Sequence, residues 1–272
     1  MSFPKFALNR SVAPHLSFDG YLKLCTALNV DAIELRNDLP GIDLYNRSKQ
    51  KHIQECCAQH AIKILTINAL YPFDLWNRDR EKQAGTLFEM AEHMGVHAIV
   101  CCPFNEKNDV RTPDERKKDL YTALTHLKKL CLASGVRAFI EPLGFTQSAL
   151  RRKKDAVDAI NAVEGQGVFK LVHDTFHHHL AQEKNFFVEY TGIVHVSGVM
   201  DSSIALNHLL DAHRVLVYSA DQLENIDQLK QFQIARYKGY VSYEPFAESV
   251  QNSGTIQRDL KESMNFIRNQ LN

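Results

Sequence analysis

The sequence has no excess of charge of either sign. Lys plus Arg and Asp plus Glu number 32 each among the 272 residues, so the formal net charge is zero. Proteins that follow a nucleic-acid backbone usually carry a basic excess, because their cations neutralise phosphates. The balance leaves room for a local basic groove, but it argues against a nucleic-acid partner.

Long apolar runs are also missing. The first ten residues, MSFPKFALNR, contain no apolar run of signal-peptide length. No stretch approaches the roughly 18 apolar residues of a membrane span. We therefore expect a cytoplasmic protein without a membrane partner, in a compartment where thiols stay reduced.

Paired cysteine motifs are absent as well. None of the six cysteines stands in a CxxC pair, and two pairs are adjacent in sequence. That spacing suits neither a zinc knuckle nor a disulfide framework. We expect buried, reduced thiols that pack in strands and helices. The cysteines are Cys25, Cys56, Cys57, Cys101, Cys102 and Cys131.

No GxGxxG or GxxxxGKS/T motif follows an apolar run, and no Pro/Ser-rich linker divides the chain. Instead, short apolar runs alternate with longer amphipathic segments. The predicted strands are Phe6–Asn9, Ala32–Leu35, Ile64–Asn68, Ala98–Cys102, Ala138–Glu141, Phe169–His173, Ile193–Val196 and Tyr240–Glu244. The predicted helices are Ser17–Asn29, Ser48–His60, Arg78–Gly95, Pro113–Ser134, Lys153–Val163, His179–Tyr190, Asp221–Ala235 and Thr255–Leu271.

Strands that alternate with helices of this length pair in parallel, because parallel neighbours need a crossover connection. Eight such units in one run predict a single (β/α)8 barrel over residues 1–272, close to the roughly 250 residues typical of that fold. An open doubly wound sheet is the alternative. Gly95 and Gly135 directly follow helical patterns, where a left-handed C-cap residue is expected.

In such a barrel the active site lies at the C-terminal ends of the strands. The fifth to eighth predicted strands all end in acidic or imidazole side chains. Buried carboxylates there are costly unless they are paired or bound to a cation. A set of oxygen and nitrogen ligands without a thiolate suits one divalent ion, such as Zn, Mn, Co or Mg. The alternative is that these groups form ion pairs or cap helices. They are Glu141, Asp174, His195 and Glu244.

Other polar residues near strand ends are candidates for ligand contacts. His177 stands three residues after the strand-six aspartate, so both can face one mouth if the segment HDTFHHHL makes a helical turn. In the same segment, His179 is a weaker candidate. Asn68 ends the third strand, and Arg36 follows the second, either as a substrate clamp or as an ion-pair partner in the barrel floor. Trp76 either forms an apolar wall over the site or packs in the core.

These segments together resemble the xylose isomerase-like barrel superfamily and, within it, the inosose isomerases of myo-inositol catabolism. The ordered set of Glu, Asp-x-x-His, His and Glu at strand ends five to eight is its specific part. The resemblance spans nearly the whole chain, through AIELR at Ala32–Arg36, INAL and NRD within Ile67–Asp79, IEPLGF at Ile140–Phe145, LVHDTFHHH at Leu171–His179, IVHVSG at Ile193–Gly198, HRVLV at His213–Val217 and VSYEPF at Val241–Phe246.

The resemblance implies metal ligands at the four strand-end residues, substrate contacts at His177 and Arg214, and a homodimer or homotetramer. Two departures bear on the substrate rather than on the metal. Ser197 and Gly198 follow the strand-seven histidine, where relatives often carry an acidic residue. The sequence VLVYSAD stands where relatives often have a glycine-rich turn.

The chemistry that fits is isomerisation of a polyhydroxylated ketone, most specifically an inosose, through an enediolate. A metal would polarise the carbonyl, and two carboxylates would remove and return protons. Our hypothesis is that Glu141 and Glu244 are both ligands and the acid/base pair, while Arg214, His177 and Asn68 bind substrate oxygens.

Three alternatives stay open. An open-chain sugar epimerase or a hydroxypyruvate isomerase would use the same metal and carboxylates, since loop shape sets the substrate. An apurinic-site endonuclease on this barrel would need a multinuclear metal cluster with further His and Asp ligands, where this chain offers Asn68. A non-catalytic sugar-binding or regulatory barrel would bind without turnover.

Overall fold

The strands close into one parallel barrel. The computed structural model describes residues 3–39 and 44–272. Each strand pairs in parallel with the next, and the eighth pairs with the first. The predicted (β/α)8 barrel is therefore confirmed, and the open sheet is wrong. The strands are β1 (Lys5–Asn9), β2 (Ala32–Arg36), β3 (Lys63–Leu70), β4 (Ala98–Cys101), β5 (Arg137–Ile140), β6 (Phe169–Asp174), β7 (Thr191–Val196) and β8 (Tyr240–Tyr243).

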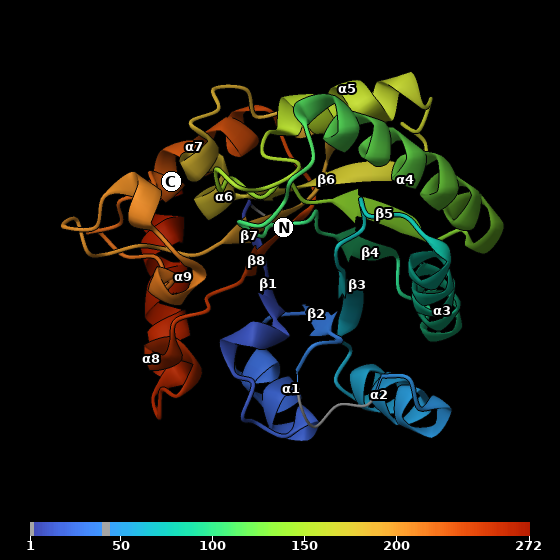
Figure 1. Cartoon of the computed structure of the whole chain (residues 1–272). Coiled ribbons are helices and arrows are strands. Elements are labelled where there is room, and N and C mark those ends of the chain that lie inside the picture. The colour runs from blue at the N-terminus through green and yellow to red at the C-terminus, as the bar shows by residue number, and fades with distance from the viewer. Residues whose placement is uncertain (1–2, 40–43) are drawn as a thin grey trace.

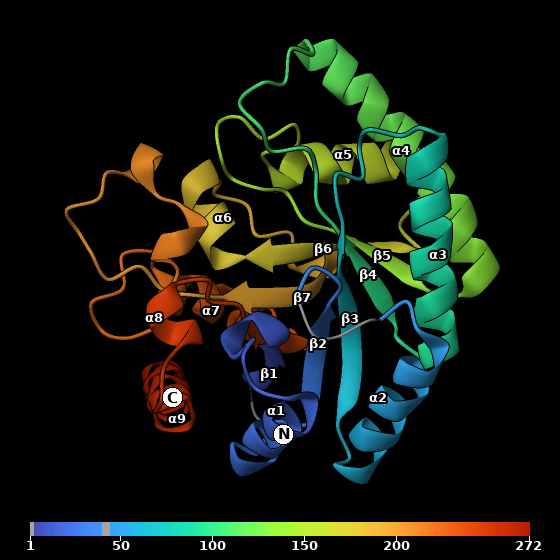
Figure 2. The ribbon, with the colours of Figure 1, turned by 60° about the horizontal axis from the view of Figure 1, so that its bottom comes forward.

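Helices surround the barrel, as Figure 1 shows. In Figure 2, α2, α3 and α4 lie side by side outside the strands. Along residues 3–39 and 44–272, none of the helices has the length and apolar character needed to cross a membrane. The helices are α1 (Phe18–Ala27), α2 (Arg47–Gln59), α3 (Arg78–Met94), α4 (Pro113–Ser134), α5 (Lys153–Ala162), α6 (Thr175–Ala181), α7 (Asn225–Ile234), α8 (Glu248–Gln251) and α9 (Ile256–Leu271).

A small apolar cluster fills the barrel interior below the strand ends. It combines Val100, Phe139, Val172 and Ile193 from neighbouring strands with Ala98. The Phe139 ring packs against a glycine in β7, where an added Cβ would lie 2.6 Å from the ring. This packing fills the barrel interior beneath the polar side chains at the strand ends.

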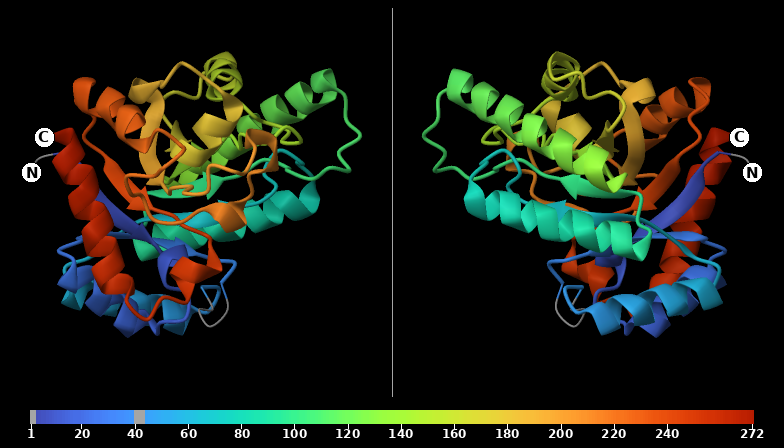
Figure 3. Two further views of the ribbon diagram at one scale, coloured as in Figure 1. Left: turned by 90° about the vertical axis from the view of Figure 1, so that its left-hand side faces the viewer. Right: turned by 90° about the vertical axis from the view of Figure 1, so that its right-hand side faces the viewer.

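The larger core lies between the barrel and the helices. The last helix, α9, lies beside the first strand (Figure 3). There the Arg268 guanidinium stacks over the Phe6 ring at 4.9 Å, so the end of the chain covers its beginning. Local signals set several helix ends. Gly95 and Gly135 cap α3 and α4 in the left-handed conformation, as predicted, with φ of 66° and 72°.

The sixth helix does not lie where its pattern predicted it. It spans Thr175–Ala181 rather than His179–Tyr190, and only a 3₁₀ turn at Val188–Tyr190 falls in the second half of that segment. The cause is Asp174, whose carboxylate accepts hydrogen bonds from the first backbone N–H groups after β6 and caps the helix at once. A strand-end ligand candidate is thus also an N-cap.

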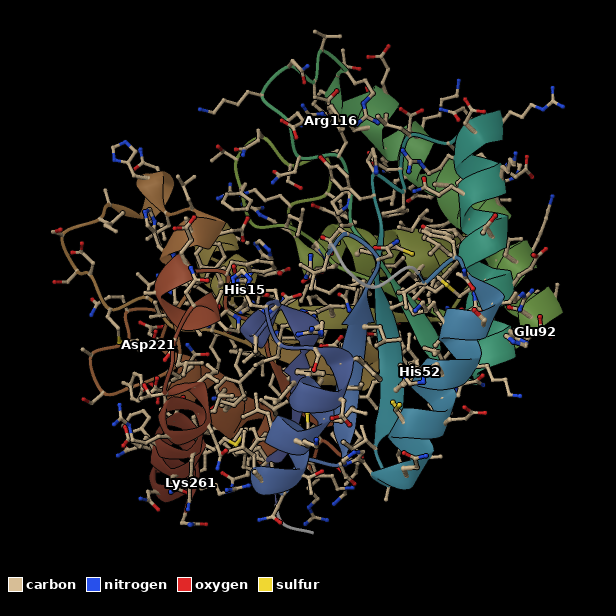
Figure 4. All side chains as sticks on the ribbon, turned by 90° about the horizontal axis from the view of Figure 1, so that it is seen from below. His15, His52, Glu92, Arg116, Asp221 and Lys261 are labelled. Carbon is tan, nitrogen blue, oxygen red and sulfur yellow. The ribbon has the colours of Figure 1, made fainter. Side chains whose placement is uncertain are left out.

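The seventh helix begins at Asn225, four residues later than predicted. Asp221, labelled in Figure 4, lies in the preceding loop. Its carboxylate accepts hydrogen bonds from the backbone N–H groups of Val199 and Asn225, at 3.1 and 3.0 Å. The residue expected inside the helix therefore ties the long β7–α7 loop to the end of β7.

Candidate metal centre

Four strand-end side chains meet in the barrel mouth. One ligand atom from each of Glu141, Asp174, His195 and Glu244 lies within 4.8 Å of all the others, and all four residues are buried. His195 Nδ1 lies 3.3 Å from Glu141 Oε1, 3.1 Å from Glu244 Oε2 and 4.0 Å from Asp174 Oδ2. The structure therefore brings together the four residues that the sequence singled out, and their role as metal ligands stays a prediction.

Barrel register explains how four distant segments converge. Asp174 and His195 are direct neighbours on β6 and β7. Glu141 and Glu244 were predicted to end their strands, but β5 and β8 end one residue earlier. Their backbone N–H groups still bond across the barrel wall, to Cys101 and Val196, each at 3.0 Å. Both carboxylates therefore lie one residue beyond the ends of their strands, at the mouth of the barrel.

The imidazole of His195 is oriented from below by a fifth carboxylate. His195 Nε2 lies 3.1 Å from Glu34 Oε2, and both side chains are fully buried. The same Glu34 oxygen accepts a hydrogen bond from Thr66 Oγ1 at 2.6 Å. Burial alone would raise the pKa of Glu34, but the interactions with His195 and the hydroxyl outweigh burial and lower the pKa to about 2. A permanent carboxylate at Nε2 holds one proton there, so Nδ1 faces the cluster and takes either a second proton or a cation.

That Nδ1 atom shows that the donor set fits a cation. It is buried and makes no hydrogen bond, although two carboxylate oxygens lie within 3.3 Å. Burial would lower the pKa of His195, but the carboxylates of Glu244 and Glu34 raise it well above its usual value. The cluster therefore demands positive charge at this point. Three carboxylate oxygens and one imidazole nitrogen are ligands that a divalent transition ion accepts.

The carboxylates of Asp174 and Glu244 share the guanidinium of Arg214. Arg214 Nη2 donates to Asp174 Oδ2 at 2.5 Å and to Glu244 Oε2 at 3.1 Å. Glu244 Oε1 accepts from Asn9 Nδ2 at 3.0 Å and from Arg36 Nη1 at 3.1 Å. Burial would raise the pKa of Glu244, but His195 and the two arginines lower it to about 2. Both carboxylate oxygens of Glu244 therefore accept hydrogen bonds from arginines, which keeps the carboxylate ionised.

Glu141 has a different environment. Its Oε2 lies 3.3 Å from the Cys102 Sγ, which donates the hydrogen bond. Burial, followed by the charge of Glu141, raises the pKa of the Cys102 thiol, so the sulfur keeps its proton. No arginine contact is recorded for Glu141 among the described residues. The two glutamates are therefore unequal, because only Glu244 is surrounded by fixed positive charge.

A cavity of about 220 Å³ opens above the cluster. Leu143 and Phe246 supply its apolar wall. Its polar lining includes Arg36, Asn68, Glu141, His177, Arg214 and Glu244. All three residues predicted to contact substrate therefore face one space beside the two predicted acid/base carboxylates. A larger, shallow depression of about 960 Å³ lies on the outer face of α4 and contains none of these side chains.

The segment that departs from the resemblance positions Arg214. Ser197 Oγ accepts a hydrogen bond from Arg214 Nε at 2.9 Å. Gly198 exchanges two backbone hydrogen bonds with Val215, at 2.7 and 2.8 Å. A Cβ on Gly198 would lie 2.8 Å from the carbonyl oxygen of Leu216, so the close approach of the two segments requires glycine. The Ser-Gly pair thus brings the arginine over the cluster.

The other residues predicted to contact substrate differ in whether their polar atoms already have hydrogen-bond partners in the protein. The first turn of α6 turns His177 toward the cavity, and its Nδ1 is buried without a partner. Asn68 Nδ2 donates to Glu34 Oε2 at 3.2 Å and to Thr66 at 3.0 Å. Its amide nitrogen is therefore committed to the carboxylate behind His195. Arg36 lines the mouth rather than the barrel floor and pairs with Glu244.

Two candidates do not take part in this cavity. Trp76 stacks on His126 of α4, with ring centroids 5.2 Å apart, and is not among the described residues that line the cavity. The apolar-wall interpretation is therefore wrong for Trp76, and Phe246 fills that role. His179 is also outside the lining.

Sequence reasoning gave no role to Glu34, Cys102 or Asp211. The signal for Glu34 was present, since it stands two residues before Arg36 in a short apolar strand and must share its face. Cys102 directly follows a buried strand, in the same position as the glutamates. Asp211 lies in a long loop, lines the cavity and pairs with Arg214 three residues later, a local spacing that the sequence could have shown.

Within the part of the chain that is described, one group of three or more His, Cys, Asp or Glu side chains converges closely enough to hold a metal ion. Its ligand atoms lie within 4.8 Å of one another, which is the spacing expected around a single ion.

Comparison with known proteins agrees with this architecture. The family model described as "Xylose isomerase-like TIM barrel" matches residues 22–270. A comparison with curated protein sequences gives no significant match. Among solved structures, a xylose isomerase domain-containing protein from Salmonella typhimurium LT2 is 27% identical, with a TM-score of 0.86 over 98% of this chain and 97% of the other.

Two further solved structures share the fold at lower identity. The IOLI protein, solved with a bound zinc atom, is 23% identical, with a TM-score of 0.82 and 98% of each chain covered. The D-psicose 3-epimerase of Clostridium cellulolyticum H10, solved with D-tagatose, is 15% identical, with a TM-score of 0.76 over 98% of this chain and 99% of the other.

Proposed function

The chain belongs to the xylose isomerase-like TIM barrel family, and on that premise we propose that it is a metal-dependent isomerase of a small polyhydroxylated ketone. The observation that carries the proposal is the buried Nδ1 of His195, which lacks a hydrogen bond among three carboxylates while Glu34 holds Nε2. One divalent ion on Glu141, Asp174, His195 and Glu244 satisfies that arrangement. The zinc of the IOLI protein structure supports a metal in a barrel of this shape.

The substrate we favour is an inosose, a cyclic ketone that carries a hydroxyl group on each of its remaining ring carbons. The resemblance of the motifs at the strand ends supports this choice, and so does a cavity of about 220 Å³ with mixed polar and apolar walls. When bound, the divalent ion supplies a Lewis acid that polarises the ketone and stabilises negative charge on the enediolate.

The residues of the chain move the protons. Glu141 and Glu244 both line the cavity and flank His195. We assign removal of the proton beside the carbonyl to Glu141, because only a thiol competes for its outer oxygen. Glu244, held ionised by Arg36 and Arg214, then takes the proton of the neighbouring hydroxyl and passes it to the former carbonyl oxygen, while Glu141 returns its own proton to the former carbonyl carbon.

Three side chains are available to orient the hydroxyl groups. His177 Nδ1 is buried without a partner and so can bond a substrate oxygen. Arg36 Nη1 has one recorded hydrogen bond and two N–H groups, which leaves one donor for a hydroxyl. Asn68 offers its carbonyl oxygen to the cavity, because its nitrogen is already committed. Phe246 and Leu143 shield this face from water.

The test is deuterium exchange from solvent into a panel of inososes, ketohexoses and hydroxypyruvate, with metal-reconstituted protein. We expect exchange only with metal bound. Glu141→Gln keeps a ligand oxygen but removes the base, so exchange should fall by about 100-fold or more. Glu248→Gln, an exposed glutamate four residues after Glu244, is the matched control. Full exchange in a metal-loaded Glu141→Gln protein would contradict the assignment.

A sugar epimerase is the second candidate, because the solved D-psicose 3-epimerase shares the fold. Both reactions begin with the same proton abstraction. The position of the incorporated deuterium separates them: isomerisation moves the carbonyl, whereas epimerisation returns the proton to the same carbon. As for other partners, we propose a small-molecule substrate in a homodimer or homotetramer, with no nucleic acid and no membrane.

A further inference from the structure

Both guanidinium groups in the cavity are already neutralised by the chain. Arg36 donates from Nε and Nη2 to the two carboxylate oxygens of Asp38, at 2.9 and 2.6 Å. Its remaining nitrogen, Nη1, donates to Glu244 at 3.1 Å. A bidentate carboxylate occupies the same fork that would bind a phosphate or a substrate carboxylate.

Arg214 is even more fully engaged. Its Nη2 contacts Asp174 and Glu244, and its Nη1 donates to Asp211 Oδ1 at 3.1 Å. Two aromatic rings pack against it as well, since the Phe176 and Phe246 ring centroids lie 5.1 and 4.7 Å from Cζ. Each guanidinium nitrogen of Arg214 therefore has an acceptor from the protein.

The charges around the cavity do not balance. Among the described residues, six carboxylates line the cavity or contact its lining, and the ion pairs they form there are with two guanidinium groups and His195. The excess over the two guanidinium groups is four negative charges, and a divalent ion still leaves two. The four innermost carboxylates are at most 4% exposed, so solvent ions screen them poorly. An anionic ligand meets net repulsion there.

We propose that this cavity selects neutral, unphosphorylated polyhydroxy ketones of monosaccharide size, and that Asp211 enforces the selection by occupying Arg214. The inference rests on the proposed function and narrows it, since it excludes sugar phosphates and keto acids such as hydroxypyruvate. The cavity volume of about 220 Å³ is below the roughly 300–1,000 Å³ of sites for drug-sized ligands, which limits the ligand to one sugar-sized molecule.

Asp211 can be replaced without changing any of the predicted metal ligands. Its side chain is 49% exposed, and its recorded partner is Arg214. It lies on the rim, in the β7–α7 loop. Replacing it by asparagine removes one rim charge and leaves Arg214 Nη1 with a neutral amide acceptor, which an anion can displace more easily than a carboxylate.

The experiment is calorimetric titration of the metal-loaded full chain with matched pairs: D-fructose against D-fructose 6-phosphate, and dihydroxyacetone against hydroxypyruvate. For the unaltered chain we expect the neutral member to bind at least about tenfold more tightly in each pair. Asp211→Asn should raise the ratio of anionic to neutral affinity about tenfold in each pair, in a manner that added salt weakens.

Asp201→Asn is the matched control. Asp201 stands earlier in the same loop and is exposed, and its carboxylate accepts hydrogen bonds from the backbone N–H and hydroxyl of Ser203. The substitution Asp201→Asn removes the same charge without changing a partner of Arg214, so the affinity for the anionic ligands should not change. The inference is overturned if anionic members bind the unaltered chain as tightly as neutral ones, or if both variants respond equally. Deuterium exchange keeps the two proposals apart: exchange in an anionic ketone overturns the selection alone, whereas absence of exchange in every ketone overturns the isomerase.

Discussion

His195 and Glu34 come from β7 and β2 and meet inside the barrel, where His195 Nε2 lies 3.1 Å from Glu34 Oε2. The contact joins residues 161 positions apart in the sequence. It fixes the ring so that Nδ1 faces the three other ligand candidates. Metal-binding histidines commonly donate their second ring N–H to a carboxylate, which orients the ring and raises its basicity.

Removing that carboxylate should weaken the metal site without removing a ligand. In Glu34→Gln, the amide no longer favours a proton on Nε2, so we expect metal affinity to fall about 10- to 100-fold. Competition titration with a chromogenic chelator measures the affinity. Glu55→Gln, an exposed glutamate on α2, should bind metal like the unaltered chain. Equal affinities in all three proteins would remove Glu34 from the site.

Chelation should abolish exchange activity and lower thermal stability together. A ligand that binds only the folded state stabilises it by about 2.7 kcal/mol at one hundred times its Kd. We therefore expect a lower Tm after chelator treatment, and recovery of both Tm and activity with Zn, Mn or Co. Elemental analysis should find one ion per chain. Three ions per chain would instead favour the nuclease alternative.

The thiol beside Glu141 should tune turnover more than metal binding. Cys102→Ala removes the hydrogen bond from Sγ to Oε2 and lets the carboxylate rotate, so we expect kcat to fall by up to about tenfold. Cys102→Ser keeps a hydroxyl donor and should recover most of the rate. If the serine and alanine variants lose activity equally while metal content is unchanged, space at this position matters rather than the donor.

A buried lysine behind β6 should make stability depend on pH. Lys153 Nζ lies 2.7 Å from His173 Nδ1, and burial lowers the lysine pKa from 10.5 to about 7. The unfolded chain then binds the extra proton between about pH 7 and pH 10.5, so the unfolding free energy should rise with pH across that window. At about 1.4 kcal/mol for each tenfold change in proton affinity, the rise is at most about 5 kcal/mol.

The substitution Lys153→Met should flatten this rise, because it removes the titrating group. Urea unfolding at several pH values gives the comparison. Lys154→Met, at the exposed neighbouring position, should keep the original slope. A slope that survives in Lys153→Met would assign the titration to another group.

Local patterns in the sequence predicted the barrel to within a few residues at most strand ends. Alternating apolar runs and amphipathic segments carry that information, because each β/α unit forms largely from its own residues. The pattern was wrong at α6, where a single side chain decided the boundary. Helix capping was the alternative given for Asp174, and its carboxylate does accept hydrogen bonds from the next N–H groups, but the predicted start of the helix did not use that alternative.

The sequence by itself determined the eight-unit order and the acidic and imidazole residues that finish strands five to eight, since strand-end position depends on local alternation. Only the tertiary structure decided which polar atoms of separate units meet: Glu34 with His195, Cys102 with Glu141 and Arg214 with Asp174. Those contacts depend on how the barrel closes and how a long loop returns to its mouth. No local pattern encodes either one, because the interacting residues lie on different units, up to 161 positions apart in the sequence.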